Sequence, residues 1–222
     1  MIRQDKIAYL ITGFNSLGKK PLYPKDNPME CLIRTILSQG TRDENRDIAM
    51  TRLLASCPAW DNVSSLKNSD LTAIIKPAGL ATRKSETIKS FLEWCKSELK
   101  GYDLKPMSKW STKRIMNSLC SIKGIGVKTA AIFCCFSLRR AVFPVDVHVH
   151  RMLTRVGITS RRLSPEQVFN KVDSYIPYGK DYFLHCHIID HGRHICKKRP
   201  LCDECMFAKH CDYNLNKNDW VN

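Results

Sequence analysis

The sequence predicts an all-α fold, and three observations support that prediction. Apolar residues recur three and four positions apart, the spacing of one helix face, through almost the whole chain. Helix-capping residues precede two of these apolar stripes, at Asn27-Pro28 and at Ser164-Pro165. Period-two alternation, which marks a strand, is confined to Val145–His150, and a lone strand would have no partner.

The predicted helices follow one another along the chain. Near the N-terminus, one helix face carries Ile7, Leu10, Ile11, Phe14 and Leu17. Further segments with helical spacing are 27–38, 43–55, 69–76, 83–99, 111–120, 127–137, 165–176 and 181–195. The polar tail after Cys211 is expected to fray.

Local residues predict one helix start and suggest a second. Asn27 is a suitable N-cap, Pro28 suits the first helical position, and Glu30 stands where a capping box needs an acid. The run Val145–His150 is either a short strand or an extended lead into a helix whose N-cap is Asp146.

Composition and charge describe a globular, basic protein. Hydrophobic residues make up 43% and charged residues 26% of the 222 residues, which excludes a disordered or collagen-like chain. The formal net charge of +15 suits a polyanionic partner, although charge alone fits a merely basic protein equally well. No apolar run is long enough to span a membrane, and the N-terminal residues lack a signal-peptide pattern. We therefore expect a cytoplasmic protein that does not bind a membrane.

The cysteines indicate a metal centre near the C-terminus. Of eleven cysteines, four form the pattern C-x5-C-x2-C-x5-C, at Cys196, Cys202, Cys205 and Cys211. Four thiolates at this spacing can hold one Zn²⁺ ion or a [4Fe–4S] cluster, and the spacing alone leaves both open. The other seven are scattered through apolar or helical stretches, which is typical of a reducing compartment rather than a disulfide framework.

A second motif joins two predicted helices. In Leu119–Ala130 the turn Gly124-Ile125-Gly126 precedes an apolar helix that begins near Lys128. Glycines let the backbone approach a partner closely, and the amides at a helix start can hold a phosphate oxygen. A plain turn between helices would show the same pattern, so the motif by itself leaves phosphate binding open.

Three motifs in order resemble the endonuclease III family of helix–hairpin–helix DNA glycosylases. They are LCSIKGIGVKTAA, then FPVDVHVHRM, then HGRHIC with the remaining cysteines, and the resemblance runs from about residue 28 to residue 211. It implies two helical domains with a DNA-binding groove between them. Residues 26–135 would form a continuous domain that ends in the hairpin, and 1–25 with 136–222 a discontinuous domain with the cluster. It also implies a [4Fe–4S] cluster rather than zinc.

The resemblance assigns the chemistry to two residues. Lys128 matches the catalytic lysine of the bifunctional members, and Asp146 matches the catalytic aspartate. Lys128 would attack the sugar as a neutral amine, which partial burial and nearby cations would favour. Asp146 would stabilise the positive charge that builds on the sugar as the glycosidic bond breaks. Each residue also has a plainer interpretation, Lys128 as a phosphate contact and Asp146 as a structural N-cap.

Other matched residues would contact DNA. Gly124, Ile125 and Gly126 match the family's hairpin, Leu80 a residue pushed into the base stack, and Gln39 the segment that fills the vacated space. A core leucine at a helix end is an equally good interpretation of Leu80. The implied partner is double-stranded DNA with a lesion or mismatch, bound by a monomer, near the nucleoid if the source is prokaryotic.

Two departures from the family pattern leave the substrate open. The first cysteine spacing has five residues where the family has six, and Gly40 takes the position where enzymes for oxidised pyrimidines usually have glutamine. The leading hypothesis is a glycosylase with abasic-site lyase activity on damaged or mismatched pyrimidines. Its rivals are a monofunctional mismatch glycosylase, a non-catalytic iron–sulfur protein that binds DNA or senses redox state, and a structural zinc protein.

Overall fold

The structure, a computed structural model, describes residues 3–25 and 27–220. In these residues every regular element is helical, so the predicted all-α class is confirmed. The chain divides into two compact units. One is Pro24–Arg140, and the other joins the N-terminal residues up to Tyr23 to those from Ala141 onward. The continuous domain expected from the resemblance was residues 26–135, and the continuous unit in the structure is residues 24–140.

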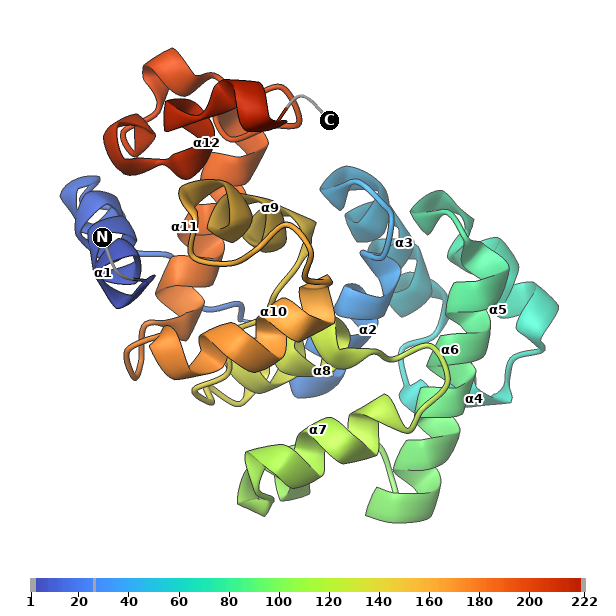
Figure 1. Ribbon diagram of the computed structural model, residues 1–222. Coiled ribbons are helices and arrows are strands. Elements are labelled where there is room, and N and C mark those ends of the chain that lie inside the picture. Colours follow the sequence, from blue (N-terminus) through green and yellow to red (C-terminus); the bar gives the residue numbers. More distant parts are fainter. Residues whose placement is uncertain (1–2, 26, 221–222) are drawn as a thin grey trace. The chain divides into compact units, whose positions relative to one another are not determined.

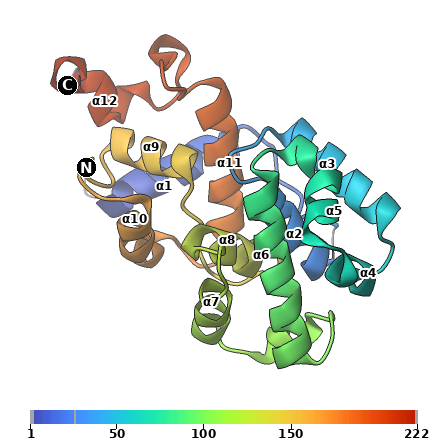
Figure 2. The same cartoon turned by 90° about the vertical axis from the view of Figure 1, so that its right-hand side faces the viewer.

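The unit Pro24–Arg140 is a bundle of short helices around an apolar core. Its elements are α2 (Pro28–Leu37), α3 (Asp43–Ser56), α4 (Trp60–Ser65), α5 (Asn68–Ile74), η1 (Lys76–Ala78), α6 (Ala81–Trp94), η2 (Cys95–Leu99), η3 (Lys105–Lys109), α7 (Thr112–Cys120), α8 (Val127–Ile132) and η4 (Phe133–Ser137). The π-helical segments η2 and η4 directly continue α6 and α8. Helix α6 packs against α2, α4 and α5, as Figures 1 and 2 show, and so forms the spine of this unit.

Local sequence explains how α2 begins. The Asn27 carboxamide oxygen accepts a hydrogen bond from the Glu30 amide (2.9 Å), and Pro28 occupies the first turn, where no amide is needed. The apolar stripe that follows is fully buried, with Leu32, Ile33 and Ile36 inaccessible to solvent. The predicted cap and stripe are both confirmed, and α2 is fixed as one wall of the core.

The other unit brings the N-terminal helix onto the C-terminal part of the chain. Its elements are α1 (Arg3–Ser16), α9 (Val147–Val156), α10 (Pro165–Val172), η5 (Asp173–Tyr175), α11 (Asp181–His194), η6 (Cys202–Glu204), η7 (Ala208–His210), α12 (Asp212–Leu215) and η8 (Lys217–Trp220). Helix α11 packs against both α1 and α9. Phe14 of α1 meets Phe207 edge-on, with ring centroids 4.8 Å apart, inside the shared core.

The structure corrects several sequence-based expectations. Leu17 lies beyond the end of α1 and is 47% exposed, so it is not part of the apolar face. Helix α4 was not predicted, because its six residues show no apolar stripe. The tail after Cys211 was expected to fray, but α12 and η8 form there, and Asp212 pairs with Lys6 of α1 at 2.6 Å.

The open question at Val145–His150 is settled in favour of a helix start. Asp146 is the N-cap of α9, and its Oδ1 accepts hydrogen bonds from the amides of His148 and Val149, each 2.8 Å long. The residues before it are extended because the chain leads into the helix there, and no strand pairs with them among residues 3–25 and 27–220. None of the helices in these residues is both long and apolar enough to cross a membrane.

One buried carboxyl gives a prediction about stability. Burial, with a smaller contribution from Asp173, raises the pKa of Asp181 at the start of α11 to about 6 from 3.8. The folded state therefore binds more protons than the unfolded chain between these values, and stability falls as the pH rises through that window. We expect Asp181→Asn to raise the free energy of unfolding at pH 7.5 by about 2 kcal/mol.

Urea denaturation at two pH values tests this expectation. The gain should be much smaller at pH 4, where the folded carboxyl is already protonated. Asp190→Asn, an exposed position on the same helix, is the control and should change little at either pH. An equal gain from Asp181→Asn at both pH values would contradict the assignment.

Candidate functional site

The predicted hairpin is a tight turn between α7 and α8. Gly124 has φ +90°, and a Cβ at this position would overlap with the Thr87 side chain of α6. Only glycine suits both demands. Ile125 is buried, and its amide donates to the Ile122 carbonyl (3.0 Å), so neither its side chain nor that amide faces outward.

The start of α8 is open to a partner. Gly126 is its N-cap, has an ordinary φ of −98°, and has no atom within 4 Å of a Cβ placed on it. No side chain caps α8, so its first-turn amides are left for another acceptor. Lys128 is exposed in this first turn, which makes the predicted partial burial of its side chain wrong.

Gln39 connects the end of α2 to the hairpin. Its Nε2 donates to the Gly124 carbonyl (3.4 Å) and lies 3.3 Å from Thr129 Oγ1 of α8. The side chain is half-buried. The structure thus brings two of the predicted DNA-contacting segments, the one at Gln39 and the hairpin, into direct contact within one unit.

Leu80 projects from a strained turn. It is the N-cap of α6, has φ +48°, and follows Gly79 with φ +64°. A leucine in the left-handed region is strained, and its side chain is nonetheless 64% exposed. The interpretation of Leu80 as a core residue is therefore wrong. An exposed apolar side chain held in a costly backbone conformation is a candidate for contact with a partner.

Asp146 lies in the other unit, in a firmly held segment. The residue is only 8% exposed, and both capping bonds end on Oδ1, so that Oδ2 takes no part in the cap. The preceding residues are tied down by two contacts: the Phe143 amide donates to Asp173 (3.2 Å), and the His185 ring lies 2.8 Å from the Pro144 carbonyl. The carboxylate position is set by the backbone on either side of it.

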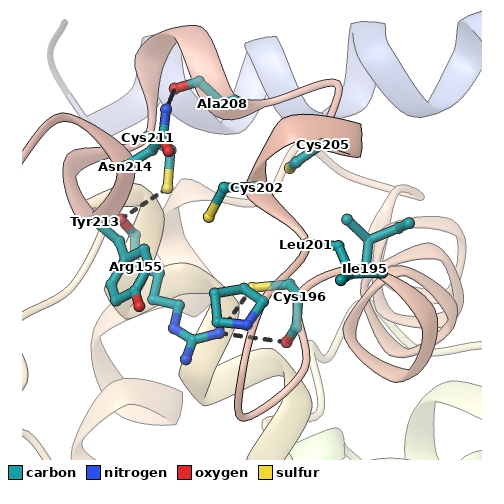
Figure 3. Close-up of a pocket in the computed structure, with 11 residues that line it drawn as sticks. Arg155, Ile195, Cys196, Leu201, Cys202, Cys205, Ala208, Cys211, Tyr213 and Asn214 are labelled. Carbon is teal, nitrogen blue, oxygen red and sulfur yellow. Dashed lines mark hydrogen bonds between the residues drawn. The ribbon is translucent and has the colours of Figure 1, made fainter. Parts of the chain in front are cut away.

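The four C-terminal cysteines line one pocket. Figure 3 shows the sulfur atoms of Cys196, Cys202 and Cys211 facing the space that the pocket residues enclose, with Cys205 beside them. Apolar residues complete the lining, among them Ile195, Pro200, Leu201 and Ala208. Among the described residues, no three His, Cys, Asp or Glu side chains are close enough together to hold one metal ion as they stand. Four thiols that line one apolar pocket have the chemistry of a metal centre held by cysteines, either zinc or an iron–sulfur cluster.

Sequence reasoning missed two residues beside the cysteines. Arg155 of α9 is buried and donates to the carbonyls of Lys197 (2.5 Å) and Lys198 (2.9 Å), and to Cys196 Sγ (3.4 Å), as Figure 3 partly shows. His191 of α11 has its Nε2 3.3 Å from Cys205 Sγ. Neither stands at a ligand spacing in the sequence. His194 and His210, which flank the cysteine segment, make no hydrogen bond to a thiol within residues 3–25 and 27–220.

Burial shapes the protonation of this pocket. It raises the pKa of the Cys205 thiol to about 11 and lowers the pKa of His191 to about 4. The His191 ring is therefore neutral near pH 7. The buried thiols have to lose protons when they bind a metal, so metal binding here is coupled to proton release.

Known proteins resemble this chain over most of its length. The model of the HhH-GPD superfamily base excision DNA repair proteins matches residues 33–177. Endonuclease III of Rickettsia conorii is 30% identical over 217 residues, which cover 96% of each chain. Endonuclease III of Thermotoga maritima is 29% identical over 192 residues, 86% of this chain and 85% of the relative.

The fold is also similar to a solved structure. A non-covalent endonuclease III–DNA complex superimposes with a TM-score of 0.84 at 22% identity, and the match covers 99% of this chain and 100% of that one. At this level of identity the likeness concerns the fold. Membership of the family rests on the match to the HhH-GPD model and on the 30% identity with the Rickettsia conorii protein.

The two hairpin glycines give a matched pair of substitutions. We expect Gly124→Ala to lower the free energy of unfolding by about 2 kcal/mol or more, because a Cβ is disfavoured at φ +90° and would overlap with Thr87. Gly126→Ala should cost less than about 1 kcal/mol, since its φ is ordinary and the space beside it is open. Denaturant unfolding measures both, and equal losses would contradict the packing described for Gly124.

Proposed function

The chain belongs to the endonuclease III family within the HhH-GPD superfamily of base excision DNA repair proteins, and from this premise we propose that it is a DNA glycosylase with abasic-site lyase activity on damaged or mismatched pyrimidines. The proposal is carried by what each unit shows by itself: Lys128 is exposed at an uncapped helix start in one, and Asp146 in the other is buried with one carboxylate oxygen free of its cap. A DNA-binding protein without catalysis would need the hairpin, and it would need Asp146 only as the N-cap of α9.

DNA binding would use the open start of α8. The amides there, together with the positive end of the helix dipole, suit a phosphate oxygen of the DNA backbone. This contact carries no sequence information, so it would position the protein on any duplex. The net charge of +15 adds attraction along the backbone that weakens with salt.

Leu80 would open the duplex at the damaged base. Enzymes that act on a base must turn it out of the stack, and apolar wedges lower the cost by filling the gap. Leu80 is exposed and lies close to Gly40. A Cβ built on Gly40 would be 3.7 Å from Leu80 Cδ1. Gln39 stands next to this position and would occupy the space that the base leaves.

The chemistry of base removal is assigned to two side chains, Lys128 and Asp146. The Lys128 amine attacks C1′ of the sugar, the glycosidic bond breaks, and the base leaves with the bonding electrons. The Asp146 carboxylate stabilises the positive charge on the sugar as this bond breaks. The attached nitrogen then loses a proton, and the C1′–O4′ bond of the sugar opens with a proton going to O4′, which leaves a Schiff base between Lys128 and C1′. Loss of the C2′ proton to solvent then expels the 3′ phosphate with its bonding electrons and nicks the strand. A monofunctional enzyme would need no amine, so the presence of Lys128 favours the lyase.

The four cysteines would hold a [4Fe–4S] cluster, with zinc the weaker alternative. When bound, such a group joins Cys196, Cys202, Cys205 and Cys211 into one cross-link of the C-terminal loops. Arg155 supports this loop by binding two of its carbonyls and the Cys196 sulfur. Arg155 also binds the start of the five-residue loop between Cys196 and Cys202, the loop that is one residue shorter than in the family pattern.

Borohydride trapping on a panel of duplexes tests the enzymatic proposal. The panel carries thymine glycol, uracil, a G·T mismatch or an abasic site. The unmodified protein should form a covalent adduct on at least one duplex, and Lys128→Ala should lose both adduct and nicking while it still binds. Asp146→Asn should bind nearly as well but excise on the order of 100-fold more slowly.

The mutants separate the rival functions. Base release without a trappable adduct in the unmodified protein would support the monofunctional enzyme and leave Lys128 as a phosphate contact. An adduct that survives in Lys128→Ala would move the nucleophile to another amine. Binding to every duplex with no release of any base would support the non-catalytic protein.

Metal content tests the cysteine assignment. The purified protein should be yellow-brown and contain about four irons per chain. Cys202→Ser should lose the colour and unfold the C-terminal loops, because metal binding and folding are coupled there. Cys120→Ser, at an exposed cysteine outside the pocket, is the control and should keep its iron. Stoichiometric zinc without iron after anaerobic purification would contradict the cluster.

A further inference from the structure

Lys84 of α6 is a buried cation with every ammonium proton in use. Its side chain is among the largest fully buried in the protein, with the residue 2% exposed. Nζ donates to the carbonyls of Leu37 and Ala78, each at 2.7 Å, and to Thr41 Oγ1 at 3.0 Å. An ammonium group has three donors, so this environment satisfies it completely.

The three acceptors come from two separate loops. Leu37 ends α2 and precedes Gln39, and Thr41 follows it in the same loop. Ala78 ends η1 and precedes the strained turn at Leu80. Thr41 Oγ1 also donates to the Ala78 carbonyl. One ammonium group therefore fastens together the two loops that carry the proposed wedge and the proposed gap-filling residue.

The burial of this charge has a cost that the contacts offset. Burial lowers the pKa of Lys84 to about 8, and a charged group out of water is tolerated only where its hydrogen bonds are made. Leu37 is the last residue of α2, so its carbonyl lies at the negative end of that helix, which favours a cation. Residues that merely fill a core do not need such an arrangement, and an apolar side chain would fill it at less cost.

We propose that Lys84 is a positioning residue that holds Leu80 and Gln39 in one fixed arrangement, so that insertion into the base stack and filling of the gap occur as a single event. The inference rests on the proposed function, because it assumes that these two residues enter the duplex. The strained φ of Leu80 is kept by this clamp, and by the Lys84 amide, which donates to the Leu80 carbonyl at 3.0 Å. Without the ammonium group, the turn at Leu80 would relax to an unstrained conformation.

The same helix offers a matched control. Lys89 of α6 likewise donates from Nζ to backbone carbonyls, those of Ser64 in the last turn of α4 and of Leu66 directly after it. The loop it holds joins α4 to α5 and carries none of the proposed DNA contacts. Lys89→Met therefore removes a clamp of the same chemistry without touching the insertion loops.

A double-mutant cycle tests the proposal. Single-turnover excision is measured on the panel duplex that the unmodified enzyme cleaves best. We expect Lys84→Met to slow it about tenfold in the unmodified background but less than twofold in the Leu80→Ala background, because the clamp acts through Leu80. Lys89→Met should stay within twofold of the unmodified enzyme. Full additivity in the cycle, or the same loss from Lys89→Met, would overturn the proposal.

A second readout keeps the test independent of folding and of chemistry. 2-Aminopurine opposite a stable abasic-site analogue reports insertion into the stack and needs no base release. If Lys84→Met does not fold, Thr41→Val, which removes one acceptor at constant shape, replaces it in the cycle. If the unmodified protein releases no base, the proposed function fails, and the 2-aminopurine signal still decides the clamp. A signal that Lys84→Met or Thr41→Val leaves unchanged overturns it.

Discussion

Backbone groups at helix ends must find hydrogen-bond partners outside the helix. In this protein, several of the proposed functional residues are the side chains that supply those hydrogen bonds. Asp146 satisfies the amides at the start of α9, and Lys84 satisfies the carbonyls at the ends of α2 and η1. Gln39 binds the Gly124 carbonyl in the hairpin. A chain built of short helices has many such ends, so it can place several polar side chains without any strand or long loop.

The start of α8, unlike that of α9, is not closed by a side chain, and glycine takes its N-cap position. In α9 the first-turn amides donate to Asp146, whereas the corresponding amides of α8 have no side-chain acceptor. Free amides at a helix start favour the binding of an anion. The same physical need thus has two outcomes: a carboxylate fixed in place in one unit, and, in the other, the helix start that we propose binds a phosphate. The glycines make the second outcome possible, Gly124 by its close packing on Thr87 and Gly126 by the open space beside it.

Features set by neighbouring residues could be predicted from the sequence. The caps at Asn27, Asp146 and Ser164 lie within three residues of the amides they bind, and the apolar stripes needed only helical spacing. Contacts between distant residues could not be predicted. Lys84 falls on the apolar stripe of its helix with Ile88 and Phe91, and that mismatch was the available signal.

The exposure of individual side chains was a further limit. Leu80 and Leu17 are both apolar residues at a helix end, and both are exposed, yet their pattern alone is that of core residues. Lys128 stands in the first turn of a helix whose other face is buried, and the sequence does not show which face it occupies. Backbone conformation decides such cases, as the positive φ of Leu80 does by turning its side chain outward.

Two of the buried cations, Lys84 and Arg155, show why each position needs its own residue type. Lys84 meets acceptors that surround a single nitrogen, which suits a compact ammonium group with three donors. Arg155 instead spans successive carbonyls of the 196–198 loop with different nitrogens, and its flat guanidinium lies 4.7 Å from the Tyr213 ring centroid. An arginine would be too large and planar for the first site, and a lysine could not bridge the second. Equal charge therefore does not make these residues interchangeable, because each one holds its loop through the shape of its donor group.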